Sequence, residues 1–137
     1  VQTCALPISS RQYTMRTFTA MAGVAVTSLG LYIAAHTASG AAATIFWMSV
    51  SLGALGFSMS ASWSTVISLG GKYTGSVSGW MNLWGNVGGV LAPIVTAFFV
   101  TNYGWNNAFT YTALFGIIAI AAWLFVNPGK QLEGTEE

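Results

Sequence analysis

Four long apolar stretches constrain this chain more than any other feature of its sequence. Each is long enough to cross a hydrocarbon layer about 30 Å thick as a helix, which takes roughly 20 residues. Only 5% of the 137 residues are charged, whereas a soluble domain carries about 25%. The stretches do not alternate apolar with polar residues, as strands in a bilayer would. We therefore expect an all-α, polytopic membrane protein whose four transmembrane helices lie at residues 17–35, 42–62, 76–100 and 108–126.

The basic residues predict how these helices are oriented. Arg11 and Arg16 precede the first stretch, Lys72 lies between the second and the third, and Lys130 follows the fourth. Lys and Arg cost roughly 2.5 to 3.5 kcal/mol at the centre of a membrane helix and collect in cytoplasmic loops. We therefore expect both termini to be cytoplasmic and the protein to lie in the plasma membrane, the inner membrane of a bacterium. Four scattered basic residues form no patch for nucleic acid.

The third stretch carries a stripe of small and polar residues along one face. At about 100° per residue, the members of this stripe fall within an arc of roughly 80°, while Trp80 and Trp84 point elsewhere. A thin face of this kind lets another backbone, water or a solute approach closely. The stripe consists of Gly75, Gly79, Asn82, Asn86, Gly89 and Pro93.

The second and first stretches also have faces of small residues, with different expected roles. In the second stretch the face ends in the indole of a tryptophan. A helix surrounded by lipid does not need such a small and polar face, so we expect solute contact to concentrate in the second and third stretches. In the first stretch we expect only close helix packing. These faces consist of Ser49, Gly53, Gly56, Ser60 and Trp63 in the second stretch, and of Gly23, Thr27, Gly30 and Ala34 in the first.

One segment resembles a known family of transporters. Residues 71–93, GKYTGSVSGWMNLWGNVGGVLAP, resemble the penultimate helix of the anion:cation symporter family of the major facilitator superfamily. The segments WNNAF at 105–109 and LFVNP at 124–128 also fit. The resemblance implies that the chain is a C-terminal fragment, helices nine to twelve, of a twelve-helix carrier whose N-terminal half is missing. Residues 11–16 would then be what remains of the basic loop before helix nine.

The resemblance also implies a function. Carriers of this family move organic anions by alternating access, together with a proton or sodium ion, and the expected substrates are sugar acids such as hexuronates or aldonates. Ser60 and Trp63 are then expected near the substrate, with Asn82 and Asn86 opposite them on the next helix. Each has a structural alternative. The two carboxamides can bond to neighbouring helices, Trp63 can be a packing ring, and Ser60 can bond to the carbonyl one turn earlier.

The ends of the chain are expected to differ from its centre. Residues 1–10 read as a non-native leader derived from a sequencing adapter, residues 11–126 as the membrane segment, and residues 127–137 as a disordered cytoplasmic tail. Cys4 is the only cysteine, so we expect no disulfide and no Cys/His metal site. We expect neither a cofactor nor enzymatic activity, because the membrane region contains no Ser–His–Asp arrangement and no paired carboxylates.

Two other classes of membrane protein compete with the carrier interpretation. A small four-helix multidrug exporter would need a carboxylate within the membrane to exchange for protons. The chain has no Asp, and its three Glu residues lie at 133, 136 and 137. A stand-alone membrane scaffold or assembly subunit without transport activity remains open.

Overall fold

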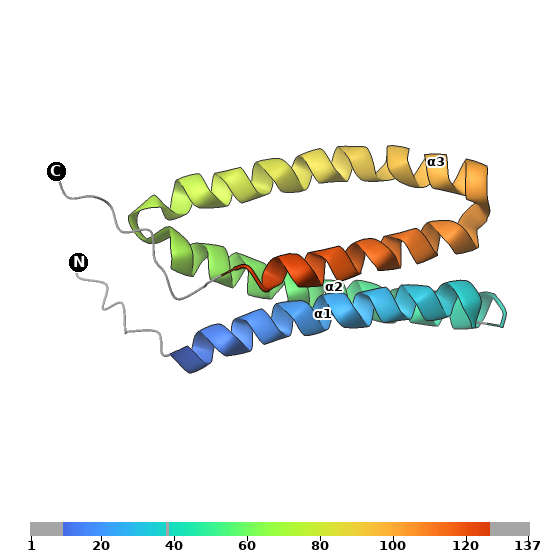
Figure 1. Ribbon diagram of the computed structural model, residues 1–137, viewed down its shortest axis with the longest axis horizontal. Coiled ribbons are helices and arrows are strands. Elements are labelled where there is room, and N and C mark those ends of the chain that lie inside the picture. The colour runs from blue at the N-terminus through green and yellow to red at the C-terminus, as the bar shows by residue number, and fades with distance from the viewer. Residues whose placement is uncertain (1–9, 38, 127–137) are drawn as a thin grey trace.

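The computed structural model describes residues 10–37 and 39–126, and within that part of the chain every regular element is a helix (Figure 1). The helices are α1 (Ser10–His36), α2 (Ala41–Gly70), the short 3-10 helix η1 (Gly71–Tyr73) and α3 (Thr74–Trp123). The all-α expectation is confirmed for these residues. The expected leader, apart from Ser10, and the expected tail lie outside them. Arg11 and Arg16 belong to α1, so the prediction that they lie in a loop is wrong.

Helix α3 consists of two arms that meet at Gly104. This glycine has φ 80° and ψ 169°, the only non-helical backbone within the element. The chain reverses there, so that the first arm, residues 74–103, and the second arm, residues 105–123, form a hairpin (Figure 1). Residues 101–107, which separate the third and fourth predicted helices and were expected to form a loop, are therefore helical except for Gly104. Pro93, a member of the predicted stripe, lies inside the first arm.

Two helical stretches are long and apolar enough to cross a membrane. They are Thr14–His36, with 23 residues, and Ala41–Trp123, with 83 residues. One crossing takes roughly 20 residues, so the second stretch is far longer than a single crossing. Glycines with positive φ, Gly71 at 48° and Gly104 at 80°, interrupt it.

Helices α1 and α2 pack closely along a seam of small residues. A Cβ atom on Gly23 would lie 2.8 Å from the carbonyl oxygen of Ala54, and one on Gly30 would overlap the hydroxyl of Ser51. The hydroxyl of Thr27 lies 3.0 Å from the carbonyl oxygen of Ser51 on α2. The expectation that Gly23, Thr27 and Gly30 allow a neighbouring helix to approach is confirmed.

The two arms of α3 differ in their contacts with the other helices. The second arm lies along α1 (Figure 1), where a Cβ atom on Gly116 would overlap the Ser28 hydroxyl and where Nε2 of His36 lies 2.8 Å from Oγ1 of Thr110. His36, the last residue of α1, thus has a hydrogen-bond partner on α3. The first arm stands apart, and every residue from 82 to 98 is exposed.

The buried side chains of the described residues are all small. The buried apolar residues are all alanines, and the buried polar ones are Ser51, Ser58 and Thr65. Large apolar side chains lie outside, for example Leu52 and Phe57, each 71% exposed. Membrane helices associate through small residues and cross-helix hydrogen bonds, because lipid tails are as apolar as leucine. This distribution is the one expected of a membrane protein.

Candidate functional site

Helix α2 has small and polar residues on two opposite sides. One side packs on α1 and includes Ser51, Ser58 and Thr65, which are 2%, 5% and 2% exposed. The other side, with Gly53, Gly56 and Ser60, is exposed and lies roughly 165° away at about 100° per residue. Only the second side was predicted to meet solute, and the structure leaves it free of α1.

Ser60 and Trp63 lie on this exposed side of α2. The Ser60 hydroxyl donates to the carbonyl oxygen of Gly56, one turn earlier, at 3.0 Å. The structural alternative for Ser60 is therefore present, although the hydroxyl oxygen keeps acceptor capacity. Trp63 is half-buried, less than one turn further along.

Asn82 and Asn86 lie on the exposed first arm of α3. Nδ2 of Asn86 donates to the carbonyl oxygen of Asn82 at 2.8 Å, within the same helix. An amide group has two donor hydrogens and an oxygen acceptor, so this bond leaves most of the Asn86 carboxamide available. Both side chains are exposed.

The glycines of the first arm are open, in contrast to those of the α1–α2 seam. A Cβ atom on Gly75, Gly79 or Gly89 would meet no atom within 4 Å. The predicted thin face therefore exists but contacts no other helix among the described residues.

Among the described residues, Asn86 and Asn82 are the two predicted site residues joined by a hydrogen bond, from the Asn86 side chain to the Asn82 backbone. The Ser60 hydroxyl bonds within α2 instead. A shared substrate site remains a prediction.

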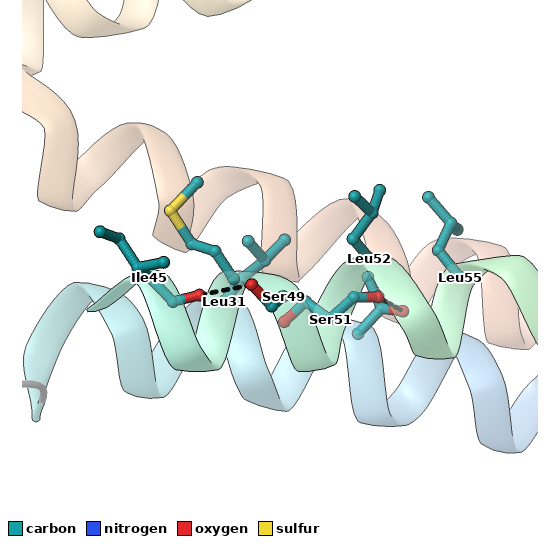
Figure 2. Close-up of a pocket in the computed structure, with 8 residues that line it drawn as sticks. Leu31, Ile45, Ser49, Ser51, Leu52 and Leu55 are labelled. Atoms are coloured by element: carbon teal, nitrogen blue, oxygen red, sulfur yellow. Dashed lines mark hydrogen bonds between the residues drawn. The ribbon is translucent and has the colours of Figure 1, made fainter. Parts of the chain in front are cut away.

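A groove of about 440 Å³ between α1 and α2 was not predicted (Figure 2). Its polar groups are already bonded to the backbone: the Ser49 hydroxyl donates to Ile45 and that of Ser51 to Trp47, each at 2.9 Å. The groove therefore suits apolar groups better than an anion. Two lining residues, Thr27 and Ser49, belong to the stripes identified in the sequence. The sequence could not predict the groove, because it depends on how α1 and α2 align. The lining includes Leu31, Ile45, Ser49, Ser51, Leu52 and Leu55.

Residues 10–37 and 39–126 contain no group of three His, Cys, Asp or Glu side chains that could hold a metal ion. The acidic residues of the chain all lie beyond residue 132.

One curated protein is similar to part of this chain. The chain is 32% identical over 77 residues to the probable sulfoacetate transporter SauU of Cupriavidus necator. The matched residues make up 55% of this chain but 18% of that transporter, so the chain spans less than a fifth of its relative. No family model matches the chain, and no solved structure matches it. The apolar helices fit a protein that lies in a membrane.

Proposed function

We propose that this chain is part of a secondary active transporter that moves a small organic anion by alternating access, together with a proton or a sodium ion. The observation that carries the proposal is the similarity to a transporter named for sulfoacetate. Sugar acids such as hexuronates and aldonates, expected from the resemblance to the anion:cation symporter family, belong to the same broad class. All of them are small anions with several oxygen atoms that accept hydrogen bonds.

The proposal includes four membrane crossings, formed by α1, α2 and the two arms of α3. In this arrangement the chain corresponds to helices nine to twelve of a twelve-helix major facilitator carrier. The exposed first arm favours the existence of a further packing partner, because every residue from 82 to 98 is free to contact other helices. We propose that this partner is the N-terminal half of the same carrier, and that both ends of the chain are cytoplasmic.

The proposed substrate contacts are Asn82 and Asn86 on α3, with Ser60 and Trp63 on α2. Carboxamides can donate to a carboxylate or sulfonate and accept from a hydroxyl. The indole of Trp63 can donate its N–H while its flat face contacts the carbon chain. Rocking of two repeats about a central site would bring the α2 and α3 surfaces to the same solute.

Uptake by the whole carrier encoded by the reading frame that contains this segment tests the proposal. Proteoliposomes would be given labelled sulfoacetate, a hexuronate or an aldonate under a proton or sodium gradient. Asn82→Leu is expected to abolish uptake while membrane insertion stays normal. Asn102→Leu is the matched control: like Asn86, Asn102 bonds to the carbonyl one turn earlier, at 2.8 Å, but it lies roughly 180° away from the stripe.

Uptake by the Asn82→Leu variant at the rate of the unmodified carrier would disprove the role of Asn82. If the unmodified carrier took up none of the three anions under either gradient, the transport proposal would fail. The scaffold alternative would then account better for the small-residue seams.

A further inference from the structure

Arg16 connects the beginning of α1 to the end of α2. Its Nη1 atom donates to the carbonyl oxygen of Ser64 at 3.2 Å and to the hydroxyl of Ser68. The side chain is half-buried. A cation near the C-terminal end of a helix is favoured by the partial negative charge of the exposed carbonyl groups. The position of Arg16 is therefore defined by α2.

The charge of Arg16 has no carboxylate to balance it among the described residues, because residues 1–132 contain neither Asp nor Glu. A second cation lies at the same end of the molecule. Lys72 belongs to η1, four positions after Ser68, and its side chain is exposed. Two positive groups thus lie at the end where α1 begins and α2 ends.

The position of Arg16 along α1 corresponds to the level of lipid headgroups. Arg16 and His36 are about 20 residues apart in one continuous helix, which spans about 30 Å at 1.5 Å per residue. This length equals the thickness of the hydrocarbon layer. When His36 lies at one boundary of that layer, Arg16 lies at the other, next to the phosphate groups.

We propose that Arg16 and Lys72 form a binding site for the phosphate group of an anionic phospholipid. Nη1 of Arg16 is held by α2, so the remaining N–H groups of the planar guanidinium are directed by that contact and can bind two phosphate oxygens. Lys72 adds a second, more mobile charge. Basic pockets between membrane helices on the cytoplasmic side bind lipid headgroups in this way. The site goes beyond the proposed transport function and involves none of its substrate contacts.

The test uses the full 137-residue chain in phosphatidylcholine bilayers that contain a small fraction of labelled phosphatidylglycerol. Binding is measured as the enrichment of the label around the protein. Each basic residue near a membrane surface contributes enough to change the affinity about fivefold. We expect Lys72→Gln to weaken binding by about this factor, Arg16→Gln to weaken it more, and Arg16→Lys to restore it in part. His36→Gln, at the other end of α1, is the matched control and should bind normally.

Two outcomes would overturn the proposal. Unchanged binding by Lys72→Gln would do so even if Arg16→Gln failed to fold, because the Lys72 side chain is exposed. Displacement of the lipid by millimolar inorganic phosphate would identify a site for free anions instead.

Discussion

Gly23 holds α1 and α2 together through the absence of a side chain. A Cβ atom there would lie 2.8 Å from the Ala54 carbonyl oxygen, a backbone atom that cannot move independently. We expect Gly23→Ala to destabilise the protein by about 1 to 3 kcal/mol, the cost of overpacking an interior. Unfolding by a denaturing detergent, followed by circular dichroism, measures the loss. Gly53→Ala is the control, because nothing lies within 4 Å of its Cβ position; equal losses in the two variants would refute the role of the seam.

Ser58 and Ser60 separate a cross-helix hydrogen bond from one within a helix. The buried Ser58 hydroxyl donates to the Ala20 carbonyl oxygen on α1 at 3.0 Å, whereas the exposed Ser60 donates within α2. Cross-helix bonds in membranes contribute about 0.6 kcal/mol on average. We expect Ser58→Ala to lower the free energy of unfolding by roughly that amount and Ser60→Ala to leave it nearly unchanged. Unfolding by a denaturing detergent, followed by circular dichroism, measures both losses. A larger loss for Ser60→Ala than for Ser58→Ala would contradict the assignment of Ser58 as the residue that bonds across the helices.

Gly104 determines the shape of α3 as an element. Its φ of 80° and ψ of 169° lie in a region that is essentially restricted to glycine. We expect Gly104→Ala to cost about 1 to 3 kcal/mol and to loosen the contact of the second arm with α1. Protease sensitivity near the turn and the free energy of unfolding would report the change. Gly88→Ala, in the first arm, meets no atom within 4 Å and should be tolerated.

The sequence predicted the helical elements better than their limits or their partners. Apolar length and low charge predicted an all-helical chain, because these two properties suffice for that inference. The reversal at Gly104 was expected as a seven-residue loop, since polar residues around a glycine do not reveal how few of them leave the helix. The buried side of α2 was missed because Ser51, Ser58 and Thr65 become interior only when α1 lies against them.

At the scale of the whole molecule, the proposed four crossings place the connections on alternate sides of the membrane. In a Cys4→Ser background, we expect Ser39→Cys and Asn106→Cys to react with an impermeant maleimide from outside intact cells. Tyr73→Cys should react only after the membrane is opened. Labelling of Tyr73→Cys and Ser39→Cys from the same side would show that α2 does not cross, and labelling of Tyr73→Cys and Asn106→Cys from one side would show the same for the first arm.

The candidate site depends on the whole molecule more than on either helix. Periodicity identified Ser60 and Trp63 on one exposed face and Asn82 and Asn86 on another, and both faces are present. It cannot predict which faces meet, because that depends on the packing of every helix between them. With residues 82 to 98 all exposed, no packing within the described residues decides where the asparagines point.

Among residues 10–37 and 39–126 the largest buried side chain is that of a threonine, which has a consequence for purifying the protein. Folding buries few large apolar side chains. The packing of the helices therefore depends on the lipid or detergent that contacts the exposed leucines, phenylalanines and tryptophans. The surrounding acyl tails then act as a continuation of the protein's own packing. Purification in a short-chain surfactant removes that support, whereas a long-chain surfactant or a lipid disc preserves it.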